Sequence, residues 1–220
     1  MFRLRTTLLV STFALLIATS GYANIILFAN LTNSQENPPT TPTLTGGGPR
    51  PASFGTATFF LNDAMTAMTF SATIFNIDIT GAQTADVNDN LTVAHIHAGP
   101  LVTPTTNGPV VWGFFGTPFN DNNPNDAVVT PFSTGVGGTF SGKWDLPEGN
   151  NTTLTAQLDN ILSGRSYINF HTTQFGGGEI RGAIQVVPEL ATSTGILLAL
   201  GAIAIIGFAR LQSGRCRRQS

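Results

Sequence analysis

Two neighbouring stretches alternate between apolar and polar side chains, and they constrain the fold more than any other feature of the sequence. Residues 55–61 and 68–75 place apolar side chains at every second position, which is the period of a β-strand with one buried face. Asn62 and Asp63 begin the connection between them, where short polar side chains favour a turn. Helical periodicity is nearly absent between residues 24 and 187. The sequence therefore predicts an antiparallel hairpin within an all-β domain.

Other short runs rich in Thr, Val, Phe and Ile have the composition of strands and are separated by turn residues. The further predicted strands are residues 25–31, 93–100, 109–115, 138–144, 153–158, 167–172 and 179–187. Residues 40–51 and 117–131, which are rich in Pro, Gly, Asn or Asp, are predicted surface loops, and residues 161–165 a turn. Eight or nine short strands with these turns predict an antiparallel Greek-key β-sandwich, either Ig-like or superoxide-dismutase-like.

The N-terminal residues have the pattern of a secretory signal peptide. Arg3 and Arg5 precede a short apolar run, and small residues at Gly21 and Ala23 provide a cleavage site before Asn24. The apolar run is too short to cross a membrane comfortably. Residues 1–23 are therefore predicted to direct export, and residues 24–187 to form the exported domain.

A nineteen-residue run without a charged side chain, from Ala191 to Ala209, is long enough to cross a bilayer as a helix. Four arginines follow it within residues 210–220, so the tail is predicted to remain cytoplasmic. With the Val187-Pro188-Glu189-Leu190 lead, residues 188–209 resemble the PEP-CTERM sorting signal of exported bacterial proteins, whose usual lead ends in Pro. The resemblance implies removal of the helix by a membrane protease and release or surface attachment; otherwise the helix remains a single-pass anchor.

The charge of the exported domain argues against nucleic acid as a partner. Residues 24–187 hold four Arg or Lys against eleven Asp or Glu, which gives a net charge of 4 − 11 = −7. Polyanions are repelled by such a surface. The single cysteine, Cys216, lies in the tail, so disulfides cannot stabilise the domain. The expected partners are the membrane, through residues 191–209, and an unknown extracellular ligand, either a protein or a glycan.

All three histidines of the chain belong to two of the predicted strands. His95 and His97 are two residues apart and therefore share one face of a strand. Tyr167, Asn169 and His171 share a face of the second strand in the same way. A third strand places Glu179 and Arg181 together. We call this set the polar seam: His95, His97, Tyr167, Asn169, His171, Glu179 and Arg181.

The order of several short elements resembles the CHRD (chordin-type) domain family. The matching elements are residues 33–39, 55–59, 94–100, 107–111, 164–172 and 177–182. In animal chordin such domains belong to an extracellular regulator of growth factors. The resemblance therefore implies a fold and an extracellular compartment more than an activity. The insertion at residues 117–131 and the bulky Phe170 depart from the family pattern.

Two interpretations of the polar seam remain open. In the first, its members hydrogen-bond one another and fix the strand register, the domain has a non-enzymatic binding or structural role, and no cofactor is needed. In the second, His95, His97 and His171 hold zinc or copper, with or without catalysis. His95-Ile96-His97 is similar to the copper-binding strand of copper/zinc superoxide dismutases. That activity is rejected because the further histidines and the disulfide are missing.

Overall fold

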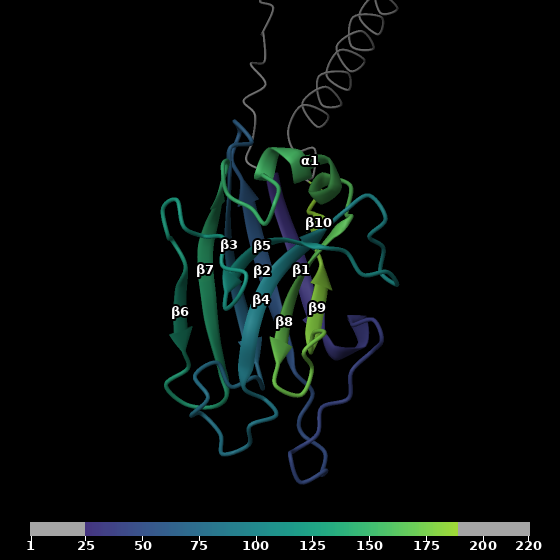
Figure 1. Cartoon of the computed structure of the whole chain (residues 1–220), viewed down its shortest axis with the longest axis vertical. Helices are drawn as coiled ribbons and strands as arrows, with labels where there is room; N and C mark the ends of the chain where they lie inside the picture. Colours follow the sequence, from purple (N-terminus) through teal and green to yellow (C-terminus); the bar gives the residue numbers. More distant parts are fainter. Residues whose placement is uncertain (1–24, 189–220) are drawn as a thin grey trace, which may run out of the picture.

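Ten β-strands form one antiparallel sheet that curls on itself in the computed structural model, which describes residues 25–188 (Figure 1). The strand order is β5-β4-β8-β9-β1-β2-β3-β7-β6, and β10 pairs with β1. The elements are β1 (Ile25–Thr32), η1 (Asn33–Gln35), β2 (Phe54–Leu61), β3 (Ala67–Phe75), β4 (Leu91–Ala98), β5 (Val110–Phe115), β6 (Val128–Pro131), β7 (Gly137–Asp145), α1 (Leu154–Leu162), β8 (Ser166–Thr172), β9 (Ile180–Ala183) and β10 (Gln185–Val186). The predicted antiparallel β class is confirmed, but a continuous curled sheet replaces the two separate sheets of the predicted sandwich.

The two halves of the curled sheet face each other across a hydrophobic core. Phe70 of β3 contacts Phe114 of β5 with ring centroids 4.6 Å apart, and Phe140 of β7 contacts Phe170 of β8 at 5.2 Å. All four side chains are buried. Because each large apolar side chain contributes about 1.5–3 kcal/mol when fully buried, these contacts hold the halves together.

The predicted hairpin is confirmed as β2 and β3. Phe59 pairs with Phe70 and Leu61 with Met68, and these side chains are buried on the core face. The alternation fixed this register because a slip of one residue would turn the apolar side chains toward solvent.

The strand predicted at residues 153–158 is wrong, because this segment begins helix α1. Thr153 caps the helix, its hydroxyl accepting a hydrogen bond from the Ala156 backbone N–H. Leu154 and Ile161 are fully buried, and Leu158 and Leu162 pack against the same core. These apolar residues have the spacing of one face of a helix. The spacing can be recognised only when residues after 158 are included. The predicted turn at residues 161–165 accordingly includes the end of α1.

Two other predicted boundaries differ from the structure. The surface loop predicted at residues 117–131 ends in an edge strand, β6, whose Val128 to Pro131 pair with β7. None of its side chains is buried, so burial imposed no alternation on its sequence. The strand predicted at residues 179–187 is divided at Ile184 into β9, which pairs with β8 and β1, and β10, which pairs with β1 alone.

Within residues 25–188, no helix is long and apolar enough to cross a membrane. The predicted signal peptide at residues 1–23, the predicted membrane helix at residues 191–209 and the basic tail at residues 210–220 lie outside the described residues.

Candidate functional site

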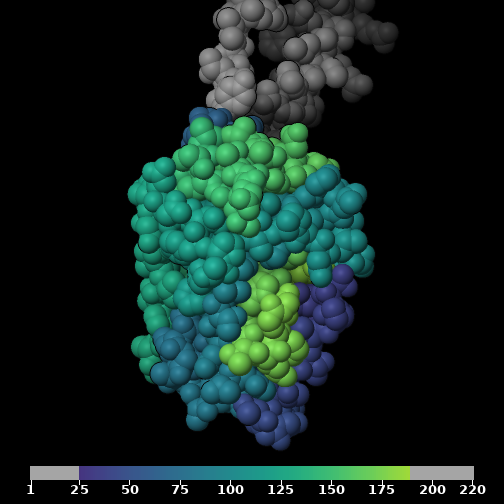
Figure 2. Space-filling view, in the orientation of Figure 1, coloured from purple at the N-terminus to yellow at the C-terminus, as the bar shows by residue number. Residues whose placement is uncertain are grey.

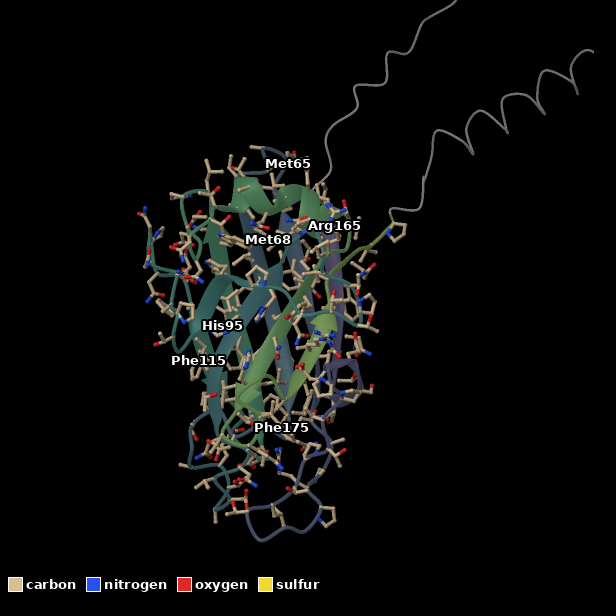
Figure 3. The ribbon with its side chains drawn as sticks, turned by 45° about the vertical axis from the view of Figure 1, so that its right-hand side comes forward. Met65, Met68, His95, Phe115, Arg165 and Phe175 are labelled. Atoms are coloured by element: carbon tan, nitrogen blue, oxygen red, sulfur yellow. The ribbon has the colours of Figure 1, made fainter. Side chains whose placement is uncertain are left out.

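The structure brings the three histidines together on adjacent strands β4 and β8. His95 pairs with Asn169, His97 with Tyr167, and His171 with Val93. One ring nitrogen from each histidine lies within 4.8 Å of the others. The prediction that His95 and His97 share a face and meet His171 from a neighbouring strand is therefore confirmed by the geometry. Figure 3 labels His95 on β4 and Phe175 in the loop that follows β8.

The histidines project from the outer face of the sheet, opposite the hydrophobic core. Ile96 and Ile168, which alternate with the seam residues, are fully buried in that core. The histidines are nevertheless buried as well, with only 4% of His95 and 7% of His97 and His171 exposed. Loops must therefore cover this part of the outer face.

Three loops provide that cover. The segment between β4 and β5 contacts His97 through Gly108, and the loop after β8 contacts His171 through Gly176. The third loop, after β5, folds back so that Asn120 exchanges hydrogen bonds with the backbone of Gly113, which lies opposite His95. Figure 2 shows the yellow-green segment after β8 at the surface, below the teal loops in this view. The histidines thus lie in a closed layer between sheet and loops.

Backbone carbonyls fix the orientation of two of the imidazole rings. Nδ1 of His97 lies 2.9 Å from the Gly108 carbonyl oxygen, and Nδ1 of His171 lies 3.0 Å from that of Gly176. A carbonyl oxygen only accepts, so each Nδ1 carries the proton and each Nε2 keeps its lone pair. Neither Nε2 has a hydrogen-bond partner among the described residues. The ring nitrogens of His95 make no hydrogen bond of good geometry there either, although the nearby Thr117 backbone raises the His95 pKa against the effect of burial. A bond from Nδ1 to a carbonyl is the arrangement by which proteins orient histidine ligands toward a metal ion.

Burial keeps the histidines neutral. It lowers the pKa of His95 and of His97 to about 4, and the nearby His171 acts in the same direction on both. Burial also lowers the pKa of His171. Neutral imidazole is the form that binds a metal ion, so the rings are ready to act as ligands at neutral pH.

Tyr167 and Arg181 extend this layer away from the histidines. The Tyr167 ring stacks on His97 with centroids 4.6 Å apart, and the Arg181 guanidinium carbon lies 4.7 Å from the Tyr167 centroid. Arg181 also pairs with Asn169 across β8 and β9, so these residues share the outer face as predicted. No seam residue hydrogen-bonds a histidine ring, however. The rings are held by loop carbonyls instead of by one another.

A model of the CHRD domain family matches residues 27–184. The chain belongs to the CHRD domain family. No curated protein and no solved structure matches the sequence. Membership of this family fits a non-enzymatic extracellular binding or structural role in general terms.

The scattered elements by which the sequence resembled CHRD domains meet in the structure around β9. Asn33 donates a side-chain hydrogen bond to the Glu179 carbonyl oxygen at 3.0 Å. Arg181 donates to the backbone of Gln35 and, at 2.8 Å, to Oδ1 of Asn107. Elements separated by 74 to 146 residues are thereby joined. Three of the motifs, residues 33–39, 107–111 and 177–182, are thus points where loops attach to the sheet of this CHRD domain.

Glu179, which the sequence placed in the seam, belongs to a different polar group. Its carboxylate pairs with Arg50 at 2.7 Å and accepts hydrogen bonds from Ser53 and Thr172. Both partners of the ion pair are buried. Arg50 was missed because it lies 129 residues from Glu179 in a loop without periodicity. The available signal was that Arg50 is one of only four basic residues between residues 24 and 187.

A second buried acid, Glu36, was also missed as a site residue. Burial raises its pKa to about 7, although the nearby Arg181 lowers it. A Cβ atom on Gly178 would lie 2.7 Å from Glu36 Oε1 and 2.6 Å from the Asn169 amide, so these groups lie close together. Glu36 belongs to the Gln35–Pro39 motif of the CHRD domain, and that motif is the signal that could have identified it.

Proposed function

We propose that this CHRD-domain protein binds one transition-metal ion, zinc or copper, through His95, His97 and His171, outside the cytoplasm. One observation carries the proposal. Three buried imidazoles converge, each has at least one unpartnered ring nitrogen, and the other nitrogen of His97 and of His171 is bound to a loop carbonyl. Such buried unpartnered nitrogens are costly unless something binds them.

The donor set favours zinc or copper over calcium or magnesium. Imidazole nitrogen suits zinc and copper, whereas calcium and magnesium take oxygen ligands. Nitrogens that bind zinc at about 2.0–2.1 Å lie about 3.3 Å apart in a tetrahedral site, so the rings need only a small inward movement from their present separation. Three protein ligands leave a position for water or another small ligand.

Elemental analysis of the purified protein, after reconstitution with zinc or with copper and removal of excess ion, tests the site. We expect one ion per chain, and we expect it to be lost in His97→Ala and His171→Ala. Tyr167→Phe is the matched control, because it keeps the ring against His97 and should retain the ion. Absence of metal after both reconstitutions, or full retention in the histidine variants, would refute the site.

The role that we propose is binding and not catalysis, at the outer face of the cell membrane or after release from it. The export pattern of residues 1–23 and the apolar run of residues 191–209 support this location. Intact mass measured on protein from the native membrane and from the medium distinguishes the two fates. A mass that retains residues 191–209 indicates an anchor, and a mass that ends before them indicates processing.

A further inference from the structure

A cavity of about 370 Å³ lies on the outer face of the sheet, beyond Tyr167 from the histidines. We call it the β8–β9 pocket. Its floor includes Tyr167, Arg181 and Gln185, and its walls include Gln35 of η1 and Thr103 and Thr105 of the loop after β4. This volume is within the range of pockets that hold small molecules. Neither the family nor the proposed metal site accounts for it.

Arg181 is a buried cation without an ion-pair partner. Only 3% of its surface is exposed, and its guanidinium donates to the neutral oxygens of Gln35, Asn107 and Pro104. Within residues 25–188 no carboxylate lies within 4.0 Å of it. Arg50, by contrast, is also buried but is paired with Glu179. A buried charge is costly unless it is paired, so the Arg181 wall of the pocket favours an anion.

Glu36, an acid that interacts with Arg181, does not fully supply that anion. Glu36 interacts with Arg181 from beyond ion-pair distance. Because burial raises its pKa to about 7, much of Glu36 is protonated at neutral pH. The guanidinium retains the capacity for a further partner, since Nη1 and Nη2 each carry a second N–H beyond the bonds described.

The remaining side chains around the pocket are suited to hydroxyl groups. Thr103, Thr105 and Gln185 supply uncharged donors and acceptors. The side-chain amide of Gln35, by contrast, is already hydrogen-bonded within the fold. The Tyr167 hydroxyl accepts a hydrogen bond from the Gly108 backbone N–H at 3.2 Å, which leaves its own proton free to donate. We propose that the β8–β9 pocket binds a small carboxylate that carries several hydroxyl groups, of the size of a sugar acid, with the carboxylate on Arg181.

Titration calorimetry on the full-length protein tests this, with glucuronate as the probe and glucose as its uncharged counterpart. We expect glucuronate to bind with a Kd below about 1 mM and glucose at least about tenfold more weakly. Gln185→Glu adds a negative charge at an exposed position of the pocket and should raise the Kd for glucuronate by about tenfold or more. Gln185→Met, which is similar in size but uncharged, should have a much smaller effect.

Equal affinity for glucose and glucuronate, no heat with glucuronate at millimolar concentration, or equal effects of the two Gln185 variants would each overturn the proposal. Gln185 is exposed on the short strand β10, so both variants should fold. A thermal melt of each variant confirms folding before titration. No metal takes part in binding at the β8–β9 pocket, so these titrations test the pocket separately from the three-histidine site.

Discussion

At the scale of single residues, this domain handles its buried polar groups in two ways. Arg50 and Glu179 satisfy each other in a closed ion pair, whereas the Nε2 atoms of His97 and His171 are buried without partners. The ion pair is typical of structural support, although Nε of Arg50 has no partner, and the convergence of unpartnered imidazole nitrogens is typical of a binding site. The seam that looks continuous in the sequence therefore separates into two groups with different roles.

The ion pair predicts a large loss of stability when one partner is removed. Glu179→Ala leaves the Arg50 charge buried and unpaired, so the free energy of unfolding should fall by about 3–5 kcal/mol. Urea denaturation measures this change. Lys143→Ala is the control, because Lys143 pairs with Asp126 and Asp145 at a partly exposed position and should cost at most about 1 kcal/mol. Similar losses in the two variants would contradict the assignment.

Asp121 predicts a pH-dependent effect. Burial raises its pKa to about 6, and its Oδ2 has no partner among the described residues. The folded state therefore binds the proton more tightly than the unfolded state, and this contribution to stability is lost as pH rises from about 4 to 6. Asp121→Asn removes this loss of stability at higher pH, because the amide does not ionise. Its Oδ1 can still accept the hydrogen bond from the Asp126 N–H.

Thermal melts of the Asp121→Asn variant between pH 4 and 7 check this prediction. We expect the variant to melt about 2–4 °C above the unaltered protein at pH 7, which corresponds to roughly 1 kcal/mol. The advantage should shrink toward pH 4, where the native aspartate is protonated as well. A difference that does not change with pH would show that Asp121 is ionised normally.

At the scale of secondary-structure elements, α1 shows how a capping residue and a longer pattern override a short one. Thr153 begins the helix and the stripe from Leu154 to Leu162 holds it against the core. Thr153→Ala should reduce the free energy of unfolding by about 0.5–2 kcal/mol because it removes the acceptor for the Ala156 N–H. Thr155→Ala, at an exposed position within α1, should be nearly neutral or slightly stabilising. Equal losses in chemical denaturation would argue against the cap.

Strand β5 and the loop that follows it depend on Gly113 for their close approach. A Cβ atom there would lie 1.8 Å from the Pro118 carbonyl oxygen and 3.0 Å from Cδ2 of His95. Gly113→Ala must therefore displace the loop, and we expect a loss of more than about 2 kcal/mol together with weaker metal binding. Gly177→Ala is the control, because nothing lies within 4 Å of its added Cβ. Unfolding and elemental analysis measure both effects, and a well-behaved Gly113→Ala protein with full metal content would refute this role.

At the scale of the whole molecule, metal binding and folding should be linked. An ion that binds only the folded state at a hundred times its Kd adds about 2.7 kcal/mol, which corresponds to a rise in Tm of about 5–11 °C. Differential scanning calorimetry with and without zinc or copper measures the rise, and a chelator should reverse it. His171→Ala should show no rise. An equal rise in that variant would mean that the ion binds elsewhere.

Local patterns predicted much of the sheet. The hairpin of β2 and β3 followed from alternation, and the shared face of His95 and His97 followed from their spacing along one strand. These features depend on residues close together in the sequence or on a single pairing of strands. The sequence did not predict the curl that joins the expected two sheets into one, because closure depends on the order of all the strands.

The cover over the site could not be predicted for a related reason. The carbonyls of Gly108 and Gly176 belong to irregular loops, and any residue type supplies a carbonyl. Arg50 pairs with Glu179, which is 129 residues away in the sequence, and no periodic sequence pattern indicates such a pairing. The sequence could therefore identify the three histidines but not the groups that orient them.

The attachment of His97 and His171 to loop carbonyls has a kinetic consequence. An ion enclosed by these rings can leave only when the loops after β4 and β8 move away, so its dissociation should be as slow as loop opening. Hydrogen exchange should report the same event, since the bound ion would slow exchange at loop amides such as those of Gly108 and Gly178. A CHRD domain built in this way would hold its ion for long periods even at moderate affinity.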